Sequence, residues 1–306
     1  MKMHRREETV GLYRGDLYLD HGPSGLAVIV ITGSLTIADN TQVSCDIWCL
    51  GDVIVGSKCN LRSITADGYI KVGEKTVVNR WLDAGTSLYL GPAVSIIASA
   101  SASEKIIIGP GFKGGKVYAP TIQALFDINI LSEALQEAAS ASQYNLREDI
   151  ANKISYWTSI RDSSETKTYP IDENDKVRWI KEKSVNSLGD YSVGPNSVVL
   201  HDIISSGSVD IGNNCIIVGS IHTDKDLYLG RKSLVTGNVA CGNLYVENEV
   251  IIAGALHAAG DAVINADTVI GLRQNEGGLA VTGSVQLKDR VTVSQEIFAG
   301  DTIYTV

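Results

Sequence analysis

A short pattern of apolar and polar positions recurs along this chain every 17 or 18 residues. Each copy begins with a small or polar pair and continues as apolar, any, apolar, as in Gly15-Asp-Leu-Tyr-Leu. Six copies start at residues 15, 33, 51, 68, 86 and 104, and seven more start at 189, 207, 225, 242, 260, 283 and 300. So many copies at one period indicate a repeat fold. The longest step, from 260 to 283, contains the polar, glycine-rich stretch 273–278, which predicts a loop.

A second period, of six residues, divides each repeat into three sides, as the spacing of Ile211 and Ile217 illustrates. Alternation within a side, as in Leu227-Tyr-Leu, directs apolar side chains inward and the others outward. One coil alone leaves its apolar face in water, whereas stacked coils bury a continuous core. The sequence therefore predicts an all-β fold, a triangular single-stranded β-helix (a solenoid) of about 12–13 coils. Glycine, asparagine or aspartate is expected to supply the positive φ at its corners.

The hand of the solenoid is indicated by pairs of an aliphatic residue and glycine. Such pairs, for example Val55-Gly and Ile211-Gly, mark left-handed helices built from six-residue repeats. Here they fall on one side of the coil only, which favours a right-handed solenoid. The left-handed form stays open as the alternative.

The repeat disappears between residues 120 and 186, where alanine, leucine, glutamate and lysine replace glycine and valine. The chain is therefore divided into an N-terminal tail (1–14), a first solenoid segment (15–119), a helical insertion (120–186) and a second solenoid segment (187–306). The second segment is expected to continue the first.

Within the insertion, apolar residues three or four apart predict helices over 131–138 and 146–161. A third short helix is predicted from Asp172 to Lys183. Trp157 and Trp179 are natural anchors, either for packing these helices on the flank of the solenoid or for docking a protein partner. The two interpretations are compatible.

The net charge of −9 argues against nucleic-acid binding, which usually needs a basic surface. The one basic run, at residues 2–6, is followed at once by two glutamates and is interpreted as a frayed terminus. No apolar run is long enough to predict a transmembrane helix or a signal peptide, so a cytoplasmic location is expected. The five cysteines match no zinc pattern and are expected to be small, buried residues of a reducing compartment.

Candidate catalytic residues are few. Acyltransferases built on left-handed solenoids use a histidine at the seam between subunits, and His222 and His257 occupy equivalent positions two coils apart. No orienting carboxylate is evident beside either, so both are interpreted as surface residues. Aspartates recur at the corners of the coils, where turn geometry explains them. No catalytic residue, cofactor or metal ligand is predicted.

The second segment resembles the bactofilins, the polymer-forming bacterial cytoskeletal family. The resemblance rests on strings such as Val218-Gly-Ser-Ile-His and Val235-Thr-Gly-Asn-Val, each followed by the recurring pattern, and it is best over 189–270 and fair over 27–115. It implies a right-handed triangular β-helix that polymerises end to end without nucleotide. The chain departs from that family in its number of coils, about twice the usual one, in its helical insertion and in lacking proline-rich tails.

The C-terminus ends within the repeat, without a polar cap. An uncapped coil exposes unpaired backbone groups and apolar side chains, which favour pairing with another copy. Residues Phe298, Ile303, Tyr304 and Val306 are therefore expected to form a self-association surface. The predicted function is a non-enzymatic structural or scaffold protein that associates with itself through its solenoid ends. The alternatives are an acyltransferase and a scaffold that binds its partner through the insertion.

Overall fold

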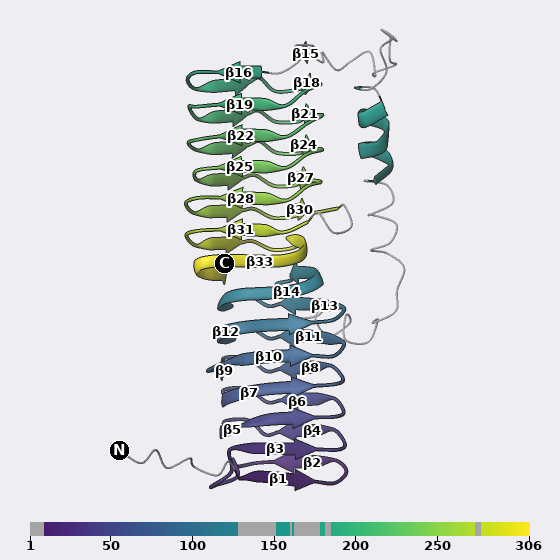
Figure 1. The fold of residues 1–306 in the computed structure, drawn as a ribbon, viewed down its shortest axis with the longest axis vertical. Helices are drawn as coiled ribbons and strands as arrows, with labels where there is room; N and C mark the ends of the chain where they lie inside the picture. Colours follow the sequence, from purple (N-terminus) through teal and green to yellow (C-terminus); the bar gives the residue numbers. More distant parts are fainter. Residues whose placement is uncertain (1–8, 128–150, 160, 162–177, 181–184, 273–276) are drawn as a thin grey trace, which may run out of the picture. The chain divides into compact units, whose positions relative to one another are not determined.

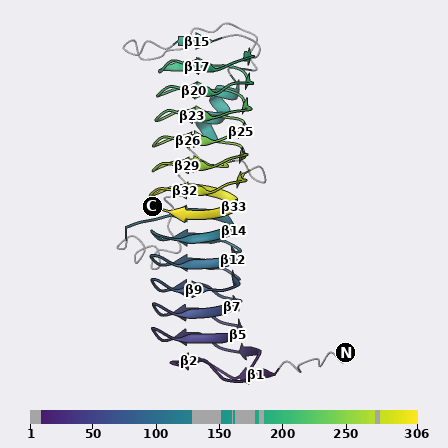
Figure 2. The same cartoon turned by 90° about the vertical axis from the view of Figure 1, so that its left-hand side faces the viewer.

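The computed structural model describes residues 9–127, 151–159, 161, 178–180, 185–272 and 277–306. The predicted β-solenoid is confirmed: parallel strands stack in about 14 coils, against the 12–13 predicted (Figures 1 and 2). The chain divides into two compact units. The first comprises residues 1–123 with 303–305, and the second comprises residues 124–302 with 306.

In the first unit, three coils combine one long strand with one short strand, and in two of the long strands, β5 and β12, the pairing shows a bend. The bend appears as a slip in register: β5 pairs in parallel with β7, and the pairing shifts between Val43 and Asp46. Each bent strand therefore makes two of the three predicted sides. The strands are β1 (Val10–Tyr13), β2 (Leu17–Leu19), β3 (Val28–Ile31), β4 (Leu35–Ile37), β5 (Gln42–Cys49), β6 (Val53–Val55), β7 (Asn60–Ala66), β8 (Ile70–Val72), β9 (Val77–Val78), β10 (Trp81–Ala84), β11 (Ser87–Leu90), β12 (Ser95–Ala102), β13 (Lys105–Ile108) and β14 (Lys113–Ala124).

In the second unit, the coils before β33 contain three separate short strands, because each strand pairs with the third one along the chain, as β17 does with β20. The long β33 pairs with both β30 and β31. The three-sided coil is thus confirmed here. The strands are β15 (Arg178–Ile180), β16 (Val185–Ser187), β17 (Tyr191–Val193), β18 (Ser197–Val199), β19 (Ile203–Ser205), β20 (Val209–Ile211), β21 (Ile216–Ile217), β22 (Ile221–Thr223), β23 (Leu227–Leu229), β24 (Leu234–Val235), β25 (Val239–Cys241), β26 (Leu244–Val246), β27 (Ile251–Ile252), β28 (Leu256–Ala258), β29 (Ala262–Ile264), β30 (Val269–Ile270), β31 (Leu279–Val281), β32 (Val285–Leu287) and β33 (Thr292–Thr305).

The period found in the sequence equals the number of residues between paired positions on neighbouring coils. Val209 pairs with Leu227 and Leu227 with Leu244, which are steps of 18 and 17 residues. The long step is also present, since Ala262 pairs with Val285, but residues 273–276 of the predicted loop lie outside the described residues. In many strands the inward residues are buried and the outward ones are not, as in β4 and β23, whereas β11 and β18 are buried throughout. Each inward aliphatic side chain contributes about 1.5–3 kcal/mol through its removal from water.

One corner of almost every coil has left-handed backbone, and glycine seldom occupies it. Asparagine or aspartate stands there in some coils, as predicted, but lysine, alanine, glutamate or arginine stands there in others. These positions are Asn40, Lys58, Lys75, Ala93, Gly111, Asn196, Asn214, Lys232, Glu249, Asp267 and Arg290.

The recurring glycines have a different role: they allow neighbouring coils to approach closely. A Cβ atom on Gly51 would lie 2.7 Å from the carbonyl oxygen of Gly33, and one on Gly237 would lie 2.6 Å from the carbonyl carbon of Gly219. The expectation that glycine supplies the positive φ at these corners therefore holds at Gly111 but not at the other positions.

The boundaries of the segments also need correction. The predicted tail (1–14) contains β1, the first segment extends through β14 to Ala124, and the second begins no later than β16. These strands lie at the ends of the two segments, where the recurring pattern continues in only one direction along the chain, so the pattern did not reveal them. Whether the second segment continues the first stays a prediction.

The insertion is helical over residues 151–159, in agreement with the predicted second helix. The first predicted helix, 131–138, and the start of the second lie outside the described residues. The third, Asp172–Lys183, is wrong where it can be compared: residues 178–180 form β15, and Trp179 pairs with Val198. The open edge of β18 satisfies the backbone groups of β15, and this tertiary pairing overrides a weak local preference for helix.

Candidate functional site

The C-terminal strand does not present the open edge that the sequence predicts. The backbone N–H of Gly111 donates to the carbonyl of Thr305, and the N–H of Thr305 donates to the carbonyl of Phe112. The Thr305 hydroxyl donates to the carbonyl of Gly109 and accepts from the N–H of Phe112, at 2.8 and 2.9 Å. All four residues belong to the first unit. The expectation of an unpaired end is thus wrong, because the final residues supply the next strand for the coil that ends at Phe112.

The four predicted association residues are accordingly in different environments. Ile303 is fully buried and Tyr304 is half-buried, whereas Phe298 and Val306 are exposed. Phe298 points outward from β33, where it pairs with Ala280, and so lies on a side of the coil and not at its end. The structure does not bring these residues together as one surface, and their part in self-association stays a prediction.

The tryptophans of the insertion are also separated. Trp157 is half-buried in the helix and packs edge to face on Tyr156, with ring centroids 5.3 Å apart. Trp179 lies in β15, with its backbone paired to β18. A docking role for either residue stays a prediction.

His222 and His257 lie on one outward row, two coils apart, because each pairs with Ala240 between them. Both are exposed. Nε2 of His222 lies 3.6 Å from the carboxylate of Asp224, which is too long for a hydrogen bond. Nothing in this arrangement buries or orients a histidine for acid–base chemistry.

The five cysteines are buried and free, as expected. Cys59 and Cys215 follow the left-handed corner residue, a position that Thr41, Ser233 and Thr268 hold in other coils. At this position the thiol or hydroxyl donates to a carbonyl of the previous coil, as Cys59 does to Ala38 at 3.1 Å and Ser233 to Gly212 at 3.0 Å. These cysteines therefore substitute for serine or threonine in a structural ladder.

Burial raises the pKa of the thiols, in the case of Cys241 to about 12. We expect a thiol reagent at pH 8 to leave the native protein unmodified and to label all five cysteines once the protein is unfolded. Because the folded pKa lies above the unfolded one, the free energy of unfolding should fall as the pH rises above about 9. Rapid labelling of the native protein would contradict this.

The first coil of the first unit carries an exposed apolar surface that sequence reasoning missed. Val10 and Leu12 of β1 are 59% and 60% exposed. Leu12 pairs with Val30, and Val30 pairs with Trp48, which is 56% exposed. These outward residues form a row that begins at the first coil. Among the strands that the structure describes, β1 pairs only with β3 and β2 only with β4, so no described strand pairs with the other side of this coil.

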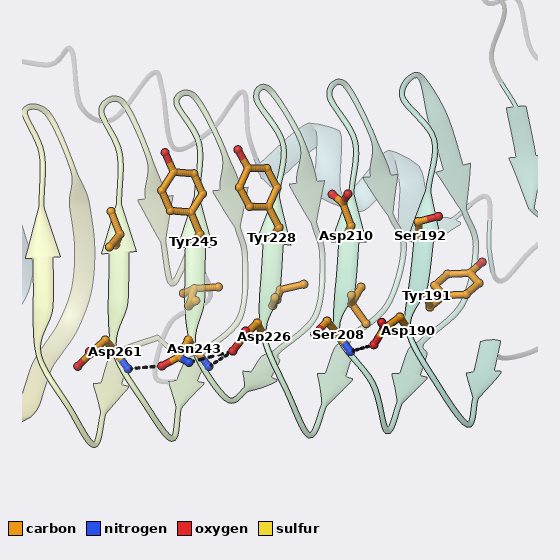
Figure 3. Close-up of a pocket in the computed structure, with 14 residues that line it drawn as sticks. Asp190, Tyr191, Ser192, Ser208, Asp210, Asp226, Tyr228, Asn243, Tyr245 and Asp261 are labelled. Carbon is orange, nitrogen blue, oxygen red and sulfur yellow. Dashed lines mark hydrogen bonds between the residues drawn. The ribbon is translucent and has the colours of Figure 1, made fainter.

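A groove of about 950 Å³ lies on one side of the second unit. Figure 3 shows its two rows of side chains. The outward residues of β17, β20, β23 and β26 form the first row: Ser192, Asp210, Tyr228 and Tyr245. The corner residues that precede these strands and β29 form the second: Asp190, Ser208, Asp226, Asn243 and Asp261.

The corner row is held by hydrogen bonds from one coil to the next (Figure 3). The carboxylate of Asp190 accepts from the N–H of Ser208 at 2.8 Å, and that of Asp226 accepts from the side-chain amide of Asn243 at 2.9 Å. The Asn243 side-chain oxygen in turn accepts from the N–H of Asp261, and Asp261 accepts from Ser284. These bonds satisfy backbone groups at the turns, so the corner row is structural.

The outward row is arranged differently. The rings of Tyr228 and Tyr245 stack, with centroids 4.8 Å apart and planes 11° from parallel. The Tyr228 hydroxyl donates to Glu247 at 2.6 Å, and this bond to a carboxylate raises the pKa of Tyr228 to about 12. Tyr228 is therefore a protonated donor to Glu247, and the residue is 38% exposed.

Comparison of the chain with protein-family models, with curated proteins and with solved structures finds no match. The resemblance to bactofilins therefore stays a prediction. Across the described ranges, no three His, Cys, Asp or Glu side chains are placed so that they could hold a metal ion. The helices of the described residues include none with the length and hydropathy needed to span a membrane.

Proposed function

We propose that this protein is a non-enzymatic structural protein that associates with itself through the first coil of its first unit. The observation that carries the proposal is the side of β1 and β2 that pairs with no described strand, bordered by exposed Val10 and Leu12. Edge strands of this kind are usually protected by charge or by a covering segment, because they pair readily with another chain. A bactofilin-like polymer is the assembly that this end would build if a second surface also associates.

The first-coil surface is preferred to the C-terminal residues because those are paired already. A structural function is preferred to the acyltransferase alternative because His222 and His257 are exposed and, among the described residues, neither has an orienting partner at hydrogen-bond distance. The alternative of a binding scaffold is supported by a separate observation, the groove on the second unit. That groove is not part of the first-coil surface.

The test is a charge at the edge. Leu12→Lys adds a cation to an outward position, where it leaves the core intact but opposes the pairing of two first coils. We expect the wild-type protein to sediment as dimers or larger species in analytical ultracentrifugation, and the variant to sediment as a monomer.

The matched control is Ile204→Lys, which introduces the same charge at an outward residue, 45% exposed, in a coil that is paired on both sides. It should leave the sedimentation of the wild type unchanged. A wild-type protein that is monomeric at high concentration would exclude the proposal, and so would equal dispersal by both variants.

A further inference from the structure

The outward row of the groove contains a step in height that creates a slot. Asp210 pairs with Ser192 on one side and with Tyr228 on the other. Neighbouring coils are about 4.8 Å apart, so the long Tyr228 side chain stands directly beside the shorter Asp210. Ser192, also short, follows one coil beyond Asp210. Tyr245 covers one face of the Tyr228 ring. Asp210 lies on the other side of Tyr228, away from Tyr245, as Figure 3 shows.

The charges around this slot have one sign. Asp190, Asp210, Asp226 and Asp261 line the groove, and no lysine, arginine or histidine lines it among the described residues. Three of these carboxylates accept backbone or side-chain N–H groups at the corners. Asp210 differs: it has no hydrogen bond or ion pair within the part of the chain that the structure describes, and it is exposed. Its carboxylate is the one that remains available to a ligand.

We propose that this slot binds the guanidinium group of an arginine in a peptide segment of a partner protein. A guanidinium is planar and can lie against the free face of Tyr228, where the ring attracts a cation. In that position its paired N–H groups point at the Asp210 carboxylate, which accepts them side by side. The remaining aspartates supply a negative field that attracts a basic segment to the groove.

The geometry favours arginine over lysine. A lysine ammonium is compact and strongly hydrated, and it gains less from a flat slot between a ring and a carboxylate. The fixed hydrogen bond of Tyr228 to Glu247 keeps the ring in place, so little side-chain order is lost on binding.

The test uses the full-length protein and the peptide Gly-Arg-Gly-Arg-Gly, titrated by isothermal calorimetry. The arginine peptide should bind, and replacing arginine by citrulline, which has the same shape without the charge, should weaken binding at least about tenfold. The lysine peptide should bind several-fold more weakly than the arginine peptide.

The variants separate this site from the general negative charge. Asp210→Asn should weaken binding at least about tenfold, and Tyr228→Leu should abolish the preference for arginine over lysine. The matched control is Asp224→Asn, which removes one exposed charge of the same unit outside the groove and should leave binding unchanged. Equal binding of the citrulline peptide would overturn the proposal, as would equal losses in Asp210→Asn and Asp224→Asn, or no binding by the wild-type protein.

Discussion

Replacing Ile303 with aspartate is expected to destabilise the first unit by about 3–5 kcal/mol, because it places an unpaired carboxylate in the core. Ile303 is fully buried, and two residues later Thr305 makes four hydrogen bonds to Gly109, Gly111 and Phe112. The variant should lose these bonds as the final strand separates. Urea denaturation followed by circular dichroism would measure the loss.

Two control variants identify the cause. Ile303→Val keeps the site apolar and should cost about 0.5–1.5 kcal/mol. Val306→Asp adds the same charge three residues later, at a side chain 56% exposed, and should change stability by less than about 0.5 kcal/mol. If Ile303→Asp instead leaves stability unchanged and disperses an oligomer, the residue lies on an intermolecular surface, as the sequence predicts.

Replacing Phe112 with alanine is expected to lower the free energy of unfolding by about 3–5 kcal/mol. Phe112 is fully buried and is one of only three phenylalanines in the chain. Its ring occupies space that a neighbouring side chain would need: a Cβ atom on Gly114 would lie 2.6 Å from the Cζ atom of Phe112. The loss of stability arises from the cavity and from the apolar contacts that the ring no longer makes.

This proximity predicts that the two positions are coupled. Gly114→Ala alone should destabilise the protein, because the ring must shift to admit the new methyl group. In the double variant Phe112→Leu with Gly114→Ala, the methyl group enters space that the ring has left. The double variant should therefore be more stable than the sum of the two single changes predicts, by about 1 kcal/mol or more in a double-mutant cycle. Additive effects would mean that the ring does not restrict residue 114.

Much of the fold could be predicted because a solenoid is local in sequence. The partner of each strand lies one repeat away, so the period of 17 or 18 residues is also the register, as the pairing of Leu227 with Leu244 shows. Inward and outward positions follow from alternation within a side. The burial of Cys59 and Cys215 follows from the same pattern, although their place in the hydroxyl ladder does not.

The candidate surfaces were harder to foresee because they depend on several repeats at once. Asp210, Tyr228 and Tyr245 are each ordinary outward residues in their own coils, and only stacking forms the slot over Asp210. The exposed row from Leu12 to Trp48 is of the same kind, and it begins in a stretch that the pattern assigns to a tail.

The sequence by itself determined the coil, its three sides and the step between strands, since these depend on residues within one repeat of each other. The tertiary structure decided what lies at the ends. Thr305 bonds to Phe112 across 193 positions of the chain, and residues 178–180 became a strand because the edge of β18 was open to them. Such pairings depend on which unsatisfied backbone groups the folded chain brings together, and no periodic pattern encodes that.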